Sequence, residues 1–254
     1  FLMMYQYMAY FSDPITTACA ILMRYRANMV HVARIDKLSD DAKIPKETKK
    51  YMTNTENLFF TEKYDFYKGK EKTDFLFHID KLKIKKGGLY VIKGENGSGK
   101  SMFLNLLFGN VKLSFSRGGF ILTDEMDEAA FLTYPIFTVD GDFMKNMYEI
   151  PIDKELMHLL QVDFSDKEIL SNPVNLSYGQ QQKLALLRVF GLNSPILFLD
   201  EPLSNLDKKT QENVVAYIRK LKGEKTILVV MHSDELDEAA DSVIYIENKK
   251  LIQK

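Results

Sequence analysis

The stretch from Gly94 to Ser101 has the residue types and spacing that bind nucleotide phosphates. Two glycines enclose four residues and are followed by Lys100 and Ser101, which is the phosphate-loop pattern. Glycines let consecutive backbone N–H groups point at the β-phosphate, because no Cβ atom blocks the approach. We expect Lys100 to reach the β- and γ-phosphates and the Ser101 hydroxyl to bind Mg²⁺. The predicted phosphate-binding residues are Gly94, Asn96, Gly97, Ser98, Gly99, Lys100 and Ser101.

A second group that could do chemistry follows the apolar run 196–199. Asp200, at the end of this run, is placed to hold Mg²⁺ through water. The adjacent Glu201 can polarise an attacking water as a general base. Acidic residues also end strands at protein surfaces without any further role, but a phosphate loop in the same chain favours the hydrolytic interpretation.

Three short apolar runs, at residues 89–92, 196–199 and 226–231, predict the strands that position these groups. Continuous apolar runs of this kind are typical of strands buried on both faces of a sheet. Ligands of such sheets lie at the carboxyl ends of the strands, so we expect the three following loops to converge. A helix predicted over residues 102–108 favours a phosphate loop over a plain glycine-rich turn, and residues 75–84 alternate like an exposed strand.

Composition limits the class of protein. Of the 254 residues, 46% are hydrophobic and 27% charged, which suits one large folded domain with a smaller appendage. The net charge of −1 gives no global positive field, so we expect no nucleic-acid partner. A single cysteine, Cys19, cannot form an internal disulfide, and cytosolic surroundings are therefore expected. Because the chain begins with Phe1, we expect a piece of a longer protein.

The first 23 residues are largely apolar and carry one formal charge, Asp13. A helix of about 20 apolar residues can span a bilayer, and the basic residues that follow suit the cytosolic side of a span. These are Arg24, Arg26, Arg34 and Lys37. An amphipathic helix packed on its own domain explains the composition equally well, because Ser12–Pro14 would be costly in lipid. We expect one helix over residues 15–38 and a solvated linker over residues 38–57.

The segment Leu176–Gln180 resembles the LSGGQ signature of ABC ATPases, and it begins 24 residues before Asp200. Residues 204–207 resemble the D-loop of that family, and His232 matches its switch histidine. The resemblance covers about residues 58–254. It implies an α/β fold, the P-loop NTPase of ABC type, in which a mixed β core carries a helical subdomain at about residues 140–190.

The resemblance also implies ATP as the nucleotide and two such domains, expected as a homodimer, arranged head to tail. ATP would lie between the phosphate loop of one copy and the signature of the other. Glu201 would activate water, His232 would hold the γ-phosphate and Asp207 would sense the opposite site. The resemblance adds Ser177, Gly179, Gln180 and Asp207 to the ATP-binding residues, gives Lys100 a catalytic role, and supports Ser101 and Asp200 as Mg²⁺ ligands.

Two residues depart from the family pattern. Tyr178 stands where the first signature glycine is usual, and a ring there would crowd the γ-phosphate of the partner's nucleotide. Tyr134 stands where a glutamine normally touches Mg²⁺ and relays the nucleotide state to a membrane domain. Tyr67 is the aromatic residue best placed to stack on adenine, with Tyr64 and Phe66 as alternatives.

The N-terminal stretch resembles the last transmembrane helix of an ABC exporter, with Pro14 before a helix that contains residues 33–35. This favours residues 1–37 as a membrane remnant, a membrane-spanning domain as partner and a place at the cytoplasmic face of the cell membrane. A soluble ABC protein would instead need paired cassettes or long coiled-coil insertions, which do not fit this length. A regulatory module with weak hydrolysis is a second rival interpretation. A P-loop kinase is a third, but a kinase would lack the signature.

Overall fold

The computed structural model describes residues 50–51, 56–68, 74–108, 113–116, 120–122, 128–132, 134–148 and 150–254, all within the compact unit Lys46–Lys254. The helix expected over residues 15–38, and with it the membrane remnant over 1–37, lies outside these residues. The expected linker 38–57 contains a short strand, β1 (Lys50–Tyr51), and β2 begins at its last residue. No helix in the described ranges has the length and apolar character of a membrane span.

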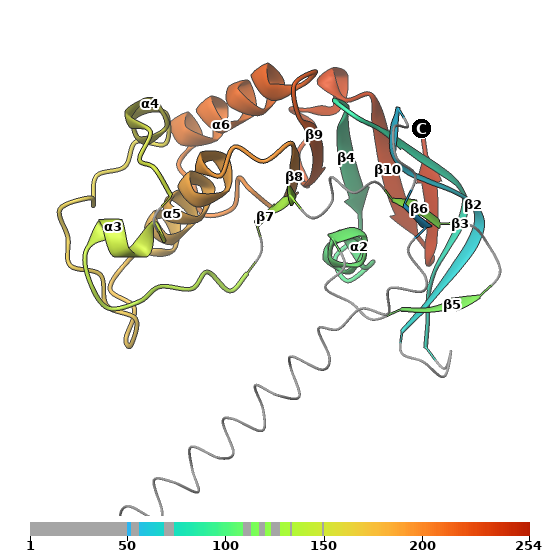
Figure 1. The fold of residues 1–254 in the computed structure, drawn as a ribbon, viewed down its shortest axis with the longest axis horizontal. Coiled ribbons are helices and arrows are strands. Elements are labelled where there is room, and N and C mark those ends of the chain that lie inside the picture. Colours follow the sequence, from blue (N-terminus) through green and yellow to red (C-terminus); the bar gives the residue numbers. More distant parts are fainter. Residues whose placement is uncertain are drawn as a thin grey trace, which may run out of the picture. The chain divides into compact units, whose positions relative to one another are not determined.

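Five strands pair in parallel and form one end of the sheet (Figure 1). In spatial order they are β10 (Ser242–Glu247), β4 (Leu89–Gly94), β9 (Thr226–Val230), β8 (Ile196–Asp200) and β7 (Ala130–Leu132). The three predicted apolar runs lie in β4, β8 and β9, and every residue of β8 and β9 is buried. Strands covered on both faces need apolar side chains on both, which explains why the runs are continuous.

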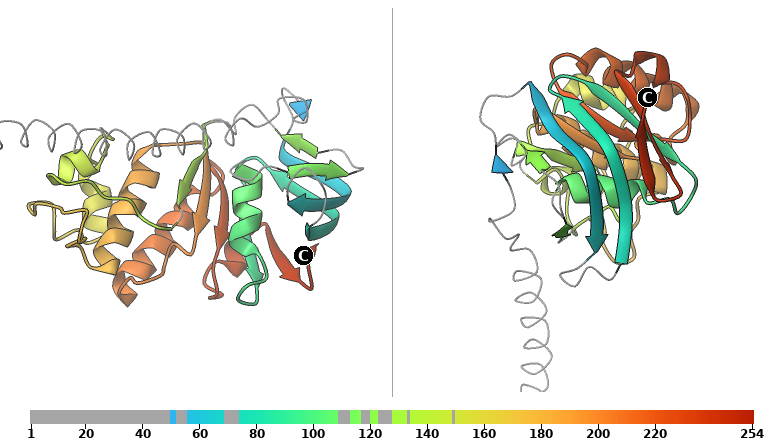
Figure 2. Two further views of the ribbon diagram at one scale, coloured as in Figure 1. Left: turned by 90° about the horizontal axis from the view of Figure 1, so that it is seen from below. Right: turned by 90° about the vertical axis from the view of Figure 1, so that its right-hand side faces the viewer.

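The sheet continues into a largely antiparallel part built on a long hairpin (Figure 2). Its strands are β2 (Asn57–Lys68), β3 (Asp74–Lys85), β5 (Leu113–Ser116), β6 (Phe120–Leu122) and β11 (Lys250–Gln253). The predicted strand 75–84 lies within β3, which pairs with β2 on one side and β11 on the other. Phe77 and Ile79 are buried and Asp80 is exposed, so the predicted alternation is confirmed.

Helices cover both faces of the parallel strands, with α2 on one face and α5 and α6 on the other (Figure 1). The helices are α2 (Lys100–Phe108), α3 (Phe143–Asn146), α4 (Lys154–Leu159), α5 (Tyr178–Gly191) and α6 (Lys208–Leu221), with a 3-10 turn at Asp237–Ala239. The predicted helix 102–108 lies in α2. Residues 140–190, predicted as a helical subdomain, contain α3, α4 and nearly all of α5.

Alternate residues of β4, β8 and β9 belong to two different hydrophobic cores. Ile92, Phe198 and Leu228 pack with α2 and the hairpin, whereas Val91 and Val229 pack with α5 and α6. Because successive side chains of a strand point to opposite faces, one buried strand contributes to both cores. The two cores therefore fix the strands from both sides.

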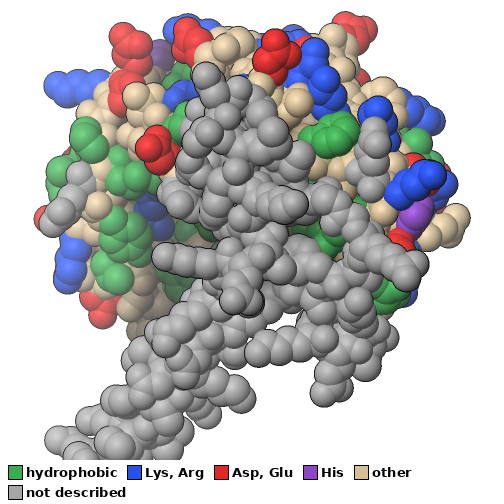
Figure 3. Space-filling view, turned by 45° about the vertical axis from the view of Figure 1, so that its right-hand side comes forward, with side chains coloured by type: hydrophobic (Ala, Val, Ile, Leu, Met, Phe, Trp, Pro, Cys, Tyr) green, Lys and Arg blue, Asp and Glu red, His purple; other side chains and the backbone are tan. Residues whose placement is uncertain are grey.

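Charged side chains of both signs are interspersed on the face of the molecule that Figure 3 shows. The chain contains 34 basic and 35 acidic residues, so neither sign dominates overall. A mixed surface of this kind lacks the single-sign field that steers polyanions to a protein.

Arg188 ties the second half of α5 to the segment before it. Its guanidinium donates hydrogen bonds to the carbonyl oxygens of Asn146 and Phe137, each 2.7 Å away. It also lies 4.4 Å from the centre of the Tyr148 ring. Burial lowers the pKa of Arg188, which the neighbouring Tyr148 partly opposes. One partly buried cation thus joins Phe137, Asn146 and Tyr148 to α5.

We expect Arg188→Met to lower the free energy of unfolding by about 1–3 kcal/mol, because two carbonyl groups lose their charged donor. Urea denaturation measures this change. The control is Lys154→Met, which replaces an exposed cation of α4 and should stay within about 0.5 kcal/mol of the unaltered chain. Equal stability of the two variants would contradict the bracing role of Arg188.

Candidate functional site

The phosphate loop, Asp200, Glu201 and His232 lie at one edge of the sheet. Strand β9 lies between β4 and β8, so the residues that follow the three strands are neighbours. Backbone hydrogen bonds continue past the strand ends, from Met231 N to Ile92 O at 3.4 Å and from Glu201 N to Val230 O at 3.0 Å. The predicted convergence of the three loops is therefore confirmed.

The loop from Gly94 to Gly99 curls around the side chain of Lys100. The Lys100 ammonium donates to the carbonyl oxygens of Gly94 at 2.9 Å and Glu95 at 3.0 Å. Gly99 has φ of +100°, and a Cβ there would lie 2.6 Å from the Phe77 ring. A side chain at this position would be strained and would collide, so the curl requires glycine.

A hollow of about 580 Å³ lies beside this loop. It is lined by the loop residues Glu95–Gly99, by Phe75–Phe77 of β3, by Met102 of α2 and by the turn Ile246–Lys249. A volume of this size is within the range of ligand pockets. Because the hollow lies next to the phosphate loop, it suits the nucleoside part of a nucleotide. Four predicted residues, Asn96, Gly97, Ser98 and Gly99, border it.

The expected adenine-stacking residue, Tyr67, is not among the lining residues. It lies behind Phe75, with 5.6 Å between the ring centres. Tyr64 and Phe66 are completely buried in the core and have no face to offer a ligand. Two aromatic residues of the alternating strand border the hollow, Phe75 and Phe77, and sequence reasoning passed over both as ligand contacts.

Asp200 and Ser101 form a polar pair next to Lys100. Burial raises the pKa of Asp200, a hydrogen bond from Ser101 opposes this, the negative charge of Glu201 adds to it and the positive charge of Lys100 opposes it. Among the described residues, Asp200 Oδ1 has no hydrogen-bond partner although it is buried. An unpaired buried carboxylate oxygen beside a hydroxyl is the donor set that a hard divalent cation prefers, so these residues fit Mg²⁺.

Glu201 and His232 are in direct contact, with 3.4 Å between Glu201 Oε1 and His232 Nε2. Their side chains are 44% and 52% exposed, so both can meet a ligand from solvent. The backbone of Glu201 has φ of +48°, in the left-handed region. A non-glycine residue held in that region is uncommon and is typical of functional sites.

Lys93 ties the segment after His232 to the strand that enters the phosphate loop. Its ammonium contacts the carboxylates of Asp234 and Asp237. Burial lowers the pKa of Lys93, but the hydrogen bonds to these two carboxylates raise it overall. Sequence reasoning did not single out Lys93, because a lysine ending a strand carries no signal without its partners.

The residues Ser177, Gly179 and Gln180 form a second group at the start of α5. Ser177 is the N-cap, and its side chain and that of Gln180 bond reciprocally to the backbone in a capping box. In the part of the chain that the structure describes, no hydrogen bond or ion pair joins this group to the phosphate loop. One chain therefore does not bring the signature-like segment to its own phosphate loop.

A family model described as "ABC transporter" matches residues 77–204, about half of the chain. The chain belongs to the ABC transporter family. The matched region runs from β3 through the phosphate loop and the signature segment to the start of the D-loop. It is thus an ABC ATP-binding domain, and its activity is that of an ATPase.

Relatives of this ABC domain include proteins named as an ATP-binding/permease protein, a flippase and a transporter ATP-binding protein. A probable ABC transporter ATP-binding/permease protein of Haemophilus influenzae is 31% identical over 67% of this chain and 35% of its own length. An ATP-dependent lipid A-core flippase of Neisseria meningitidis serogroup B is 31% identical over 68% of this chain and 31% of its own length.

An energy-coupling factor transporter ATP-binding protein of Thermotoga maritima is 28% identical over 69% of this chain and 74% of its own length. By the shares given above, this chain spans about a third of the length of the Haemophilus and Neisseria relatives.

In this ABC domain the D-loop contacts the signature directly. A Cβ on Gly179 would lie 2.7 Å from the carbonyl oxygen of Asn205. Asp207 caps α6, and hydrogen bonds from Thr210 lower its pKa. Lys183 of α5 lies 3.6 Å from the Asp207 carboxylate. Asp207 thus has a structural task within its own chain, beside the sensing role that the resemblance implies.

Both departures from the ABC pattern lie at the surface. Tyr178 is the first residue of α5 and is 77% exposed, so its ring does not pack within this chain. Tyr134 is 42% exposed, and its hydroxyl contacts Gln182 and Ser204. Sequence reasoning did not identify Gln182. The signal that could have found it is its position four residues before Leu186, which places a polar side chain on the buried face of α5.

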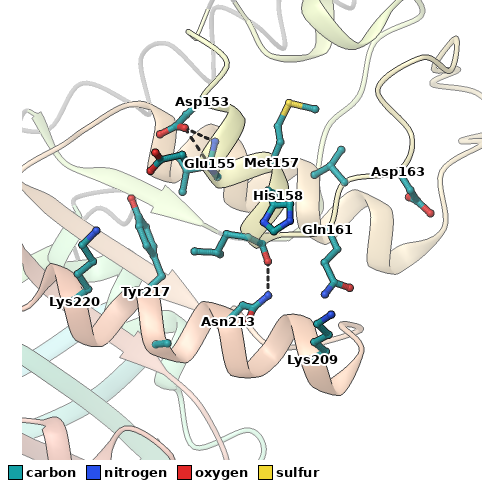
Figure 4. A pocket seen from close by; sticks show the side chains of 14 residues that line it. Asp153, Glu155, Met157, His158, Gln161, Asp163, Lys209, Asn213, Tyr217 and Lys220 are labelled. Atoms are coloured by element: carbon teal, nitrogen blue, oxygen red, sulfur yellow. Dashed lines mark hydrogen bonds between the residues drawn. The ribbon is translucent and has the colours of Figure 1, made fainter.

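A larger hollow, of about 1160 Å³, lies between α4 and α6 (Figure 4). Glu155 and His158 of α4 face Lys209 and Lys220 of α6 across it, and Asn213 donates to the carbonyl oxygen of Leu159. None of the predicted site residues lines this hollow. The large volume of this hollow is by itself no reason to assign it a part in the nucleotide chemistry.

We expect Gly179→Ala to lower the free energy of unfolding by about 1–3 kcal/mol, because the added methyl group overlaps the D-loop backbone. Without that overlap alanine would stabilise the helix by up to about 1 kcal/mol. The sign of the change in unfolding free energy therefore shows whether the overlap exists. Urea denaturation measures it. The neighbouring Tyr178→Ala, at an exposed position, should change stability by less than about 0.5 kcal/mol. A more stable Gly179→Ala chain would contradict the contact.

Proposed function

We propose that this ABC ATPase domain hydrolyses Mg-ATP to drive an exporter, and that Glu201 is the general base. The observation that carries the proposal is the contact between Glu201 and His232 at the edge that holds the phosphate loop. A carboxylate next to an imidazole, both half exposed, can orient and deprotonate a water molecule. Lys100 and the loop would hold the phosphates in reach of that water.

The side chains have distinct roles in this proposal. Lys100 leaves its carbonyl partners in the loop to bind the β- and γ-phosphates. Ser101 and Asp200 would hold Mg²⁺, which neutralises developing charge on the phosphates when bound. Glu201 takes the proton of the attacking water, and His232 donates to the γ-phosphate. Phe75, with Tyr67 behind it, offers the apolar wall for the adenine.

A second copy would complete the site, in a head-to-tail homodimer. Two observations support this: Glu201 and His232 are half exposed, and the signature segment does not reach the phosphate loop of its own chain. Ser177, Gly179 and Gln180 of one copy would face the γ-phosphate bound by the other. The N-terminal, positive end of α5 lies at that same segment and would favour a phosphate there.

We further propose that a membrane-spanning domain belongs to the same protein, which would place this domain at the cytoplasmic face of the cell membrane. The sequence before residue 38 supports this, because one formal charge in 23 residues is followed by four basic residues. The names of the Haemophilus and Neisseria relatives, a permease fusion and a flippase, also support it. Export is favoured over import by the exporter-like residues 33–35.

A regulatory module with weak hydrolysis is the second candidate, because tyrosines replace the usual residues at Tyr134 and Tyr178. Both side chains are more than a third exposed and leave the Glu201–His232 contact intact. Turnover measurements separate the two candidates.

We expect Glu201→Gln to bind ATP but to hydrolyse it at least about 10²-fold more slowly, because the amide cannot accept the proton. Phosphate release and binding of a fluorescent ATP analogue measure the two effects. Lys100→Ala is the control, since it should lose ATP binding itself. A Glu201→Gln chain that keeps more than a tenth of the activity would show that Glu201 is not the base.

We expect Tyr178→Gly to strengthen the ATP-dependent dimer when it is made in the Glu201→Gln chain. Glycine lets backbone approach the partner's nucleotide, whereas the exposed tyrosine ring occupies that space. Light scattering with Mg-ATP measures the dimer fraction. The matched control is Tyr178→Phe, which keeps the ring and should leave dimerisation unchanged. A folded Tyr178→Gly chain with a weaker dimer would refute crowding.

A further inference from the structure

Tyr134 and Gln182 connect the segment that follows β7 to the backbone of Glu201. The Tyr134 hydroxyl donates to Gln182 Oε1, and Ser204 Oγ lies 2.5 Å from the same hydroxyl. Gln182 Nε2 donates to the carbonyl oxygens of Glu201 at 3.3 Å and Pro202 at 3.0 Å. The Gln182 side chain belongs to a residue of α5 that is completely buried. Three segments that are far apart in sequence thus meet at one amide.

Two peptide carbonyl groups fix which way the Gln182 amide points, and Tyr134 binds the amide oxygen. A tyrosine hydroxyl has one proton to donate, so Ser204 must donate to the tyrosine oxygen. The amide nitrogen of Gln182 has two protons, and its oxygen has none. If the amide were reversed, its oxygen would face the Glu201 and Pro202 carbonyl oxygens, and both would lose their donor. The carbonyl oxygens can only accept and therefore select this orientation, and the Tyr134 hydroxyl holds the amide in place by donating to its oxygen.

Those peptide groups hold an unusual backbone conformation. Glu201 has φ of +48°, which a residue with a Cβ adopts only when its surroundings fix it. On one side the Glu201 N–H donates to Val230 O at 3.0 Å. On the other side the Gln182 amide binds the Glu201 carbonyl. The direction of the Glu201 carboxylate, 3.4 Å from His232, follows from this backbone.

We propose that Tyr134 is a positioning residue for hydrolysis, which anchors the Gln182 amide so that the amide holds Glu201 in its working conformation. The inference rests on the proposed role of Glu201 as general base. Tyr134 does not line the hollow beside the phosphate loop, so it acts on the base and not on nucleotide binding. At this position the usual glutamine would touch Mg²⁺; tyrosine instead stabilises the loop that carries the base.

The test is Tyr134→Phe in the full chain, measured by ATP turnover and ATP affinity. We expect kcat to fall about 10-fold, because small displacements of a reacting group are costly, with ATP affinity unchanged within about twofold. The decisive arm repeats the substitution in the Glu201→Gln chain, under single-turnover conditions with enzyme in excess. There the residual rate should change less than about twofold, since the group being positioned is gone.

Two further variants sharpen the result. Tyr148→Phe is the matched control, because its hydroxyl donates to Phe137 O at 3.4 Å, away from Glu201, and its kcat should not change. Gln182→Met should repeat the loss of kcat, and combining it with Tyr134→Phe should add little, as expected for one shared path.

Equal losses from Tyr134→Phe in both backgrounds would overturn the inference, because a general structural defect does not depend on Glu201. Normal kcat in Tyr134→Phe and Gln182→Met would overturn it as well. If Glu201→Gln itself retains more than a tenth of the activity, the base assignment fails, and the inference fails with it. That outcome is separate from the first two, which leave the base assignment intact.

Discussion

The parallel pairing of β4, β9 and β8 is the constraint on which the site depends. Because β9 is the middle strand, whatever follows it must lie between the phosphate loop and the Asp200–Glu201 pair. Backbone hydrogen bonds beyond the strand ends keep that order into the loops themselves. The burial that holds the strands together comes from two separate cores, one on each face. Packing far from the nucleotide thus determines the spacing of the groups that react.

Helix α5 connects the two functional groups of the chain. Its first turn carries the signature residues, and its backbone packs on the D-loop at Gly179. One turn further, Gln182 contacts the peptide groups that follow β8. Helix α5 thus contacts both the D-loop and the backbone of Glu201, the residue whose carboxylate lies beside His232. The signature residues and Glu201 are thus connected through α5 itself.

The sequence predicted those parts of the fold that local periodicity determines. Apolar runs identified β4, β8 and β9, and alternation identified β3, because burial on two faces or one leaves a direct trace in residue order. The convergence of Lys100, Asp200, Glu201 and His232 followed from a general rule about strand ends.

Other features depend on contacts between segments that are distant in sequence. Gln182 gains its role from Tyr134, 48 residues earlier, and from Glu201, 19 residues later. The positive φ of Glu201 and the placement of Phe75 in front of Tyr67 likewise arise from tertiary packing. The signature, the D-loop and His232 required a known family pattern, since serine, glycine and histidine have many other uses.

The bracing by Arg188 has a mechanical consequence. A guanidinium bound to two carbonyl oxygens and a ring ties the segment around Phe137 and Asn146 to the last turn of α5. Phe137, whose carbonyl oxygen Arg188 binds, is itself 71% exposed. With 14 residues at 1.5 Å each, α5 is a rod of about 21 Å. Arg188 lies in the last turn of this rod and the signature residues lie in its first, so the two carbonyl groups and the signature are attached to opposite ends of one helix.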